Sequence, residues 1–145
     1  MSPVFSADEL HSVVGGKLSK KNWKVHGISI DSREIKKNDL FIALKSKRDG
    51  NDFILSAIEK GAKAAIINKV PIGLPINFPY ILVKDSMKAL HAIAKYSRKR
   101  YKGNLVAITG SVGKTSTKDI LTKILSIFGL TYSSPKSFNN DLGVP

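Results

Sequence analysis

The sequence has no cysteine, few acidic residues and no long apolar run. Without cysteine, a disulfide framework, a thiolate metal site and a thiol nucleophile are excluded. The three histidines, His11, His26 and His91, share no metal-ligand spacing, so we infer no zinc site. No apolar stretch approaches the ~20 residues that span a bilayer, and the amino terminus lacks the basic and apolar regions of a signal peptide. We expect a globular, cytoplasmic protein with no membrane insertion.

The shortage of acidic residues leaves a large positive charge. The chain has 24 Lys and Arg against 11 Asp and Glu, a net charge of +13. This charge suggests nucleic-acid binding, but the basic residues are mostly scattered lysines, and no arginine cluster or aromatic-glycine RNA motif is present. Trp23 either stacks on a base or anchors a loop against the core. We therefore expect no nucleic-acid partner, and a diffuse positive field that attracts a polyphosphate.

The stretch from Val106 to Ser116 has a pattern typical of nucleotide-phosphate binding. A strand-like run enters a glycine turn, and a helix is expected to begin with Gly-Lys-Thr. The turn glycines allow close approach of the backbone to a ligand, and the N–H groups of the helix start attract an anion. Lys114 is expected to reach the terminal phosphates of ATP, and the Thr115 hydroxyl to ligate Mg²⁺. The expected loop residues are Gly110, Ser111, Val112, Gly113, Lys114, Thr115 and Ser116.

This loop is of a short Gly-x-x-Gly-Lys-Thr type, because Ile108 stands where the common Walker A pattern has its first glycine. The alternative is a glycine turn that joins any strand to any helix, with a lysine there by chance. The context favours phosphate binding. An apolar strand is expected over 105–108, and a helical apolar stripe runs from Ile120 to Phe128.

The pattern upstream of the loop predicts a mixed α/β unit. Helices are expected over 6–14, where Ser6 and Glu9 form a capping box, over 53–60, and from a cap at Asp85 or Ser86 to Arg100. Strands are expected over 27–30, 39–44, 64–67 and 80–83. Lys102-Gly103-Asn104 interrupts the pattern, so we place a domain boundary after residue 103.

The segment 104–145 is too short to form a nucleotide-binding domain by itself. It has room for the strand, loop and helix described above and a second short strand over 131–133. A parallel sheet of this class needs more strands and helices on both faces. Its only acids after the loop are Asp119 and Asp141, neither at the end of a strand, where a second magnesium ligand is usual. We expect the chain to be an amino-terminal piece of a longer enzyme.

Three further motifs accompany the loop: Asp31-Ser32-Arg33, Asp49-Gly50-Asn51-Asp52-Phe53, and the ending Ser137 to Pro145. Together with the loop, they resemble the ATP-dependent Mur ligases of peptidoglycan synthesis over nearly the whole chain. The resemblance implies a small mixed α/β UDP-substrate-binding domain over 1–103. Over 104–145 it implies the opening, strand-loop-helix, of a central P-loop ATPase domain.

The resemblance also implies a reaction, with the full-length enzyme a monomer. ATP phosphorylates the terminal carboxylate of UDP-N-acetylmuramoyl-tripeptide (UDP-MurNAc-tripeptide), the amine of D-Ala-D-Ala attacks the acyl phosphate, and ADP and phosphate leave. Lys114 and Thr115, with Mg²⁺, would be the catalytic residues. Asn139 and Asn140 would lie beside the nucleotide; the alternative is that they form the turn before Gly143-Val144-Pro145.

Ser32, Arg33 and Lys45 are the candidates for contact with the UDP moiety. A hydroxyl donor and a guanidinium on a loop after a strand suit a pyrophosphate. The alternatives are that Asp31-Ser32 caps a turn, with Arg33 in an ion pair to Glu34 or Asp39, and that Lys45 is a solvated strand-end lysine. Many members of the family have histidine where this chain has Asn51, so any charged role there is in doubt.

Three other functions remain open. A sister Mur ligase that adds lysine or diaminopimelate would use the same motifs, since the incoming amine is selected beyond Pro145. A non-catalytic nucleotide- or nucleic-acid-binding module would use the basic surface. A remnant of a decayed gene would have no activity.

Overall fold

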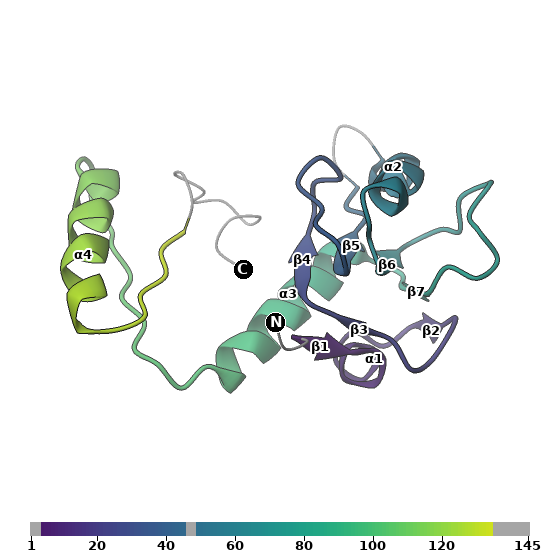
Figure 1. Ribbon diagram of the computed structural model, residues 1–145, viewed down its shortest axis with the longest axis horizontal. Coiled ribbons are helices and arrows are strands. Elements are labelled where there is room, and N and C mark those ends of the chain that lie inside the picture. Colours follow the sequence, from purple (N-terminus) through teal and green to yellow (C-terminus); the bar gives the residue numbers. More distant parts are fainter. Residues whose placement is uncertain (1–3, 46–48, 135–145) are drawn as a thin grey trace. The chain divides into compact units, whose positions relative to one another are not determined.

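The computed structural model describes residues 4–45 and 49–134 (Figure 1). Its contacts divide the chain into two compact units, Met1–Arg98 and Lys99–Pro145. The domain boundary expected after residue 103 stays a prediction.

The first unit is built on a five-stranded sheet with the order β2-β7-β6-β5-β4. The strands are β2 (Lys17–Leu18), β4 (Gly27–Ser29), β5 (Asp39–Ile42), β6 (Ala64–Ile67) and β7 (Tyr80–Leu82). Strands β4 to β7 are parallel neighbours, and β2 pairs antiparallel with β7. Because parallel strands point the same way, the loops that follow β4, β5 and β6 leave from one edge of the sheet. We call it the carboxyl edge.

Five helical segments are described: α1 (Ala7–Val14), the 3-10 turn η1 (Gly50–Phe53), α2 (Ile54–Glu59), α3 (Ser86–Arg100) and α4 (Lys114–Phe128). The predicted capping box of α1 is confirmed, because the Ser6 hydroxyl accepts from the Glu9 N–H and the Glu9 carboxylate accepts from the Ser6 N–H. Asp85 caps α3 by accepting the N–H groups of Met87 and Lys88. Local side-chain chemistry therefore sets where these helices begin.

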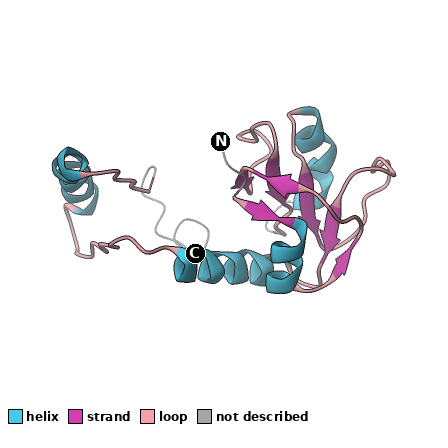
Figure 2. Ribbon diagram, turned by 60° about the horizontal axis from the view of Figure 1, so that its bottom comes forward, coloured by secondary structure: helices cyan, strands magenta, loops and turns pink. Residues whose placement is uncertain are grey.

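The sheet is buried on both faces, which explains why residues 40–42 of β5 and all of β6 are apolar. Leu40 and Ile42 face a core shared with α1 and α3, whereas Phe41 faces a second core with α2 and Phe78. This alternation follows the two-residue period of a strand. The result is a three-layer unit with helices on each side of the sheet (Figure 2).

The structure departs from the sequence-based prediction in its shortest elements. The pairs β1 (Phe5–Ser6) and β3 (Lys24–Val25) form a separate antiparallel sheet, and β2 adds an edge to the main one. None of the three was predicted, because two residues are too few to show alternation. The predicted strands are confirmed: the one at 64–67 has the predicted bounds, and those at 27–30, 39–44 and 80–83 end one or two residues earlier than predicted.

In the second unit, the strands predicted over 105–108 and 131–133 are not formed within the described residues. A strand needs a neighbour to complete its ladder, and no described residue supplies one. Leu105 and Val106 are consequently exposed. The helix after the loop does form, as α4, but it buries no residue, so its apolar stripe faces outward.

Candidate functional site

The carboxyl edge brings together the residues that the sequence suggested for UDP binding. Ser32 and Arg33 follow β4, and Lys45 follows β5, the adjacent parallel strand. Ser32 is buried, whereas Arg33 and Lys45 are exposed. Ligands of open α/β sheets bind outside the carboxyl ends of the strands. The topology therefore agrees with a shared ligand site for these three residues.

The loop after β4 is held by local hydrogen bonds. The Ser29 hydroxyl accepts from the Asp31 N–H at 3.1 Å and donates to the Asp31 carbonyl at 3.0 Å. The Arg33 guanidinium grips the Asp31 carboxylate with two nitrogens, Nε to Oδ1 at 3.0 Å and Nη2 to Oδ2 at 2.6 Å. In the alternative interpretation Arg33 pairs with Glu34 or Asp39, but its partner in the structure is Asp31, whose carboxylate lies within the same tight turn.

This ion pair orients the Arg33 side chain but does not use all of its N–H donors. A guanidinium carries more donors than one carboxylate can accept, so Arg33 keeps N–H groups for an anion. Its side chain is 83% exposed, so a ligand can reach it. Asp31 thus acts as a brace that points a cation outward at the carboxyl edge.

The pKa of the Asp31 carboxyl depends on its ion pair with Arg33. The hydrogen bonds from Arg33 lower the pKa of the Asp31 carboxyl from 3.8 to about 2. Since the folded pKa lies below the unfolded value near 3.9, the pair stabilises the fold above about pH 4, and this contribution is lost as the pH falls toward 2. We expect a carboxyl NMR titration to give a midpoint near 2 for Asp31, and Arg33→Ala to return it toward 3.8. An unchanged midpoint in Arg33→Ala would contradict the brace.

A second polar network joins the loop after β5 to the loop after β6. The Asp49 carboxylate accepts from the Asn51 N–H at 3.0 Å and from Lys69 Nζ at 2.8 Å. The Asn51 amide nitrogen also donates to Asp49 and, at 2.6 Å, to Asn68 Oδ1. The Lys69 and Asn51 contacts together hold the pKa of the Asp49 carboxyl well below its usual range. This network holds the loops after β5 and β6 together at the carboxyl edge, near Lys45.

Sequence reasoning missed Asn68 and Lys69 as parts of this edge. The available signal was their position directly after the buried strand β6. Asn51 is 1% exposed, and its Oδ1 has no hydrogen-bond partner among the described residues. A neutral amide at this position suits a buried network, whereas a charged side chain would need a further partner.

Gly50 shows how tightly this loop packs. A Cβ at Gly50 would lie 2.6 Å from both the N and the O atom of Leu44. The Gly50 N–H donates to the same Leu44 oxygen at 2.9 Å. Any side chain at this position would push apart the two arms of the loop that presents Lys45.

The phosphate-type loop lies in the second unit, at the start of α4. Gly113 caps the helix in the left-handed conformation (φ 77°), and the Gly110 φ of 153° also disfavours a side chain. Lys114 begins α4, and its ammonium donates to the Gly110 carbonyl oxygen. The lysine side chain therefore folds back over the glycine loop that the sequence predicted to precede this helix.

The described residues fit the oxygen chemistry of Mg²⁺ only in part. Thr115 supplies a hydroxyl in the first turn of α4, and Mg²⁺ is usually held by one or two protein oxygens together with substrate phosphates. The described residues contain no cluster of three or more His, Cys, Asp or Glu side chains suited to a metal. Asn139 and Asn140 lie outside the described residues.

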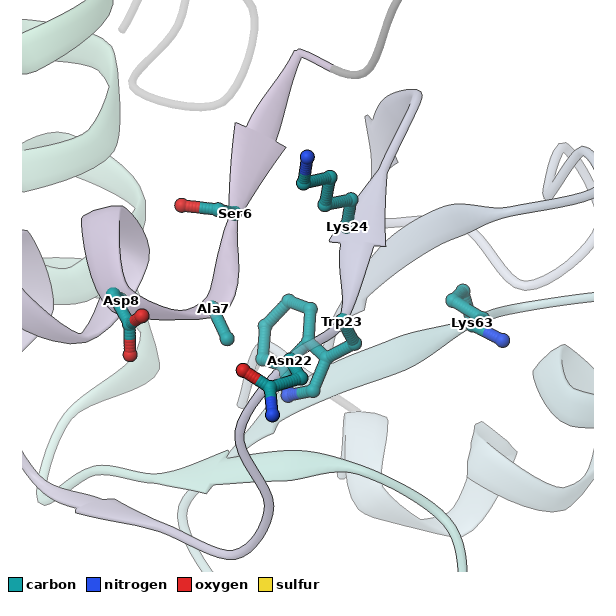
Figure 3. A pocket seen from close by; sticks show the side chains of 7 residues that line it. All are labelled: Ser6, Ala7, Asp8, Asn22, Trp23, Lys24 and Lys63. Carbon is teal, nitrogen blue, oxygen red and sulfur yellow. The ribbon is translucent and has the colours of Figure 1, made fainter.

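A cavity of about 420 Å³ lies beside β1 and β3. Figure 3 shows the side chains that line it. Its walls are formed by Ser6, Ala7, Asp8, Asn22, Trp23, Lys24 and Lys63. Trp23 is 4% exposed and donates its ring N–H to the Lys20 carbonyl at 2.8 Å, so it anchors a loop against the core. Lys63 directly precedes β6, so the cavity lies away from the carboxyl edge. None of the predicted site residues lines it.

The profile of the Mur ligase family, catalytic domain, matches residues 24–98. The chain therefore belongs to the Mur ligase family. It is similar to the UDP-N-acetylmuramoyl-tripeptide–D-alanyl-D-alanine ligase of Rickettsia prowazekii (strain Madrid E), with 44% identity over 141 residues, which are 97% of this chain and 31% of that protein.

Solved structures give the same family. A crystal structure of MurF from Acinetobacter baumannii matches 99% of this chain and 32% of its own, with a TM-score of 0.82 and 32% identity. MurF ligase from Thermotoga maritima in complex with ADP matches 80% of this chain and 27% of its own, with a TM-score of 0.63 and 33% identity. The chain thus spans about a third of the length of these relatives.

Proposed function

We propose that this chain supplies the UDP-substrate site and the phosphate loop of an ATP-dependent, ADP-forming ligase of peptidoglycan precursor synthesis. The ligase would join D-Ala-D-Ala to UDP-MurNAc-tripeptide, in the cytoplasm and as a monomer. The observation that carries the proposal is the pairing, in one Mur-family chain, of a braced arginine at the carboxyl edge with a Gly-x-x-Gly-Lys-Thr loop capping a helix.

In the first unit, the UDP moiety would lie along the carboxyl edge. The remaining Arg33 donors would bind the pyrophosphate, because a planar guanidinium matches two phosphate oxygens at once. Ser32 would add a hydroxyl and Lys45 a second cation from the neighbouring strand end. The Asp49–Asn51–Lys69 network would hold the loop that carries Lys45. This assigns residues 1–103 to substrate binding.

In the second unit, the loop from Gly110 to Ser116 would bind the phosphates of ATP. The Lys114 ammonium would exchange its hydrogen bond to Gly110 for the terminal phosphates, and the positive end of α4 would face them. Mg²⁺, held in part by Thr115, would neutralise phosphate charge when bound. Asn139 and Asn140 would lie beside the nucleotide. Residues 104–145 would thus open the ATP-binding domain.

The reaction would proceed in two transfers. A carboxylate oxygen of the tripeptide attacks the terminal phosphorus of ATP, and the bond to ADP breaks. The amine nitrogen of D-Ala-D-Ala then attacks the acyl carbon, phosphate leaves with the bonding electrons, and the amine loses a proton. Lys114 stabilises the negative charge that spreads over the transferring phosphoryl group in the first transfer.

Calorimetry on the chain tests the substrate half of this proposal. UDP-MurNAc-tripeptide should bind, free UDP should compete, and the muramoyl-tripeptide without UDP should not bind. The net charge of +13 favours nucleic acid as the rival ligand, so DNA and RNA are titrated across a salt series. Steep, sequence-independent nucleic-acid binding without any affinity for the UDP compound would contradict the proposal.

A further inference from the structure

The loop over residues 68–79, between β6 and β7, exposes apolar side chains. It extends away from the sheet and is drawn in teal at the right of Figure 1. Ile72 is 100% exposed, Ile76 is 96% exposed and Val70 is 50% exposed. Two fully exposed isoleucines on one loop are a stronger signal than the isolated apolar residues found on any surface.

The loop is anchored at two points, and the exposure of its isoleucines follows from this anchoring. Its apolar residues alternate: Leu74 and Phe78 pack into the core that contains α2, while Ile72 and Ile76 stay outside. Two turns hold this arrangement, with the Leu74 N–H on the Pro71 carbonyl at 3.3 Å and the Phe78 N–H on the Pro75 carbonyl at 2.9 Å. The prolines restrict the backbone further. The two isoleucines are therefore presented by an anchored loop.

The segments next to this loop, in the sequence and across the sheet, are rich in lysine. Residues 10–30 and 60–84 together contain eight lysines and no acidic residue. These two segments meet in space, because β2 pairs with β7 and Lys20 Nζ donates to Asn77 Oδ1 at 2.8 Å. Lys21 follows and is exposed. Asp49 pairs with Lys69 at the start of the loop. The loop thus combines exposed apolar side chains at its tip with the positive charges of Lys20 and Lys21 beside it.

We propose that this loop docks on an anionic lipid surface, with Ile72 and Ile76 inserted among the head groups and Lys20 and Lys21 facing the anionic lipids. Charge complementarity selects this occupant, because lysines near a bilayer are attracted to acidic head groups. Two isoleucines on a projecting loop cover far less than the ~800 Å² per partner of a standard protein interface. A deformable lipid surface can bury such a tip completely. This contact is peripheral: no helix in the described residues is long and apolar enough to cross a membrane.

Vesicle sedimentation with the full chain tests the proposal. The chain should partition onto vesicles of equal parts phosphatidylglycerol and phosphatidylcholine, bind phosphatidylcholine vesicles poorly, and dissociate as salt rises. The double variant Ile72→Ser/Ile76→Ser should lower partition at least about tenfold. Lys20→Gln/Lys21→Gln should lower it on anionic vesicles alone, by about fivefold per lysine. In Ile76→Trp, emission should shift to the blue on vesicles, beyond any shift from the buried Trp23.

The matched control is Ile127→Ser, which removes an exposed isoleucine from α4 in the other unit. It should bind vesicles like the wild type. Circular dichroism melting should show that the loop variants stay folded, since the replaced side chains are exposed. Loss of binding in Ile127→Ser but not in the loop variant would place the lipid contact on α4 and overturn the proposal. So would wild-type binding by the loop variant, or no partition onto either vesicle, which would leave the loop to a protein partner.

Discussion

Lys114→Ala is expected to lower turnover about a thousandfold in a ligase whose phosphate loop comes from this chain. The assay uses a chimera in which this chain replaces the matching 31% of the Rickettsia prowazekii ligase, with which it shares 44% identity. Lys114 begins α4 and already lies over the loop through its bond to Gly110. Its removal leaves the phosphoryl charge without its cation, whereas the loop amides stay in place.

Substrate binding should survive this change. The affinity of the Lys114→Ala chimera for UDP-MurNAc-tripeptide, measured by calorimetry, should match that of the unmutated chimera, because the proposal assigns the two ligands to different units. Lys123→Ala is the matched control, since Lys123 is exposed on the same helix. It should turn over normally. Simultaneous loss of turnover and of substrate binding in Lys114→Ala would show that the division of ligands between 1–103 and 104–145 is wrong.

Arg33→Ala should weaken the binding of UDP-MurNAc-tripeptide to the chain by roughly 10-fold to 100-fold. The estimate follows from the ~1.5–3 kcal/mol of a hydrogen bond to a charged group. The measurement is calorimetry. Asp31→Asn should have a smaller effect, because it removes the brace but leaves the guanidinium in place.

Arg98→Ala is the matched control for this experiment. It removes the same charge from the same unit, at an exposed position near the far end of α3. Any loss of affinity that it shares with Arg33→Ala is due to net charge alone. Equal losses in the two variants would remove Arg33 from the site, and unchanged affinity in Arg33→Ala would do the same.

Local signals were sufficient to predict the main elements of the first unit. Ser6 and Glu9 mark the start of α1 because their side chains satisfy N–H groups that the helix leaves open. The apolar character of β5 and β6 was sufficient to predict strands there, and the two cores that cover the sheet explain why both strands are buried. The order of motifs along the chain was sufficient to indicate the family, to which the profile match over 24–98 assigns it.

Contacts between distant residues were beyond such signals. The bond from Asn51 to Asn68 joins two loops that only the β5–β6 pairing brings together. The pairing of Arg33 with Asp31 is local, but it was also missed, because it depends on the exact turn after β4. The strand predicted over 105–108 does not form for a related reason. Strand propensity alone is not sufficient, and the described residues provide no neighbouring strand to pair with it.

The ligase activity of the unmutated chimera is the most direct test of the proposed function. If this chain supplies the UDP-substrate site and the phosphate loop, ADP should accumulate over many turnovers only when UDP-MurNAc-tripeptide and D-Ala-D-Ala are both present. Mass spectrometry should then show the joined product. A chimera that folds and binds ATP, yet forms neither ADP nor product with both substrates present, would contradict the proposed function.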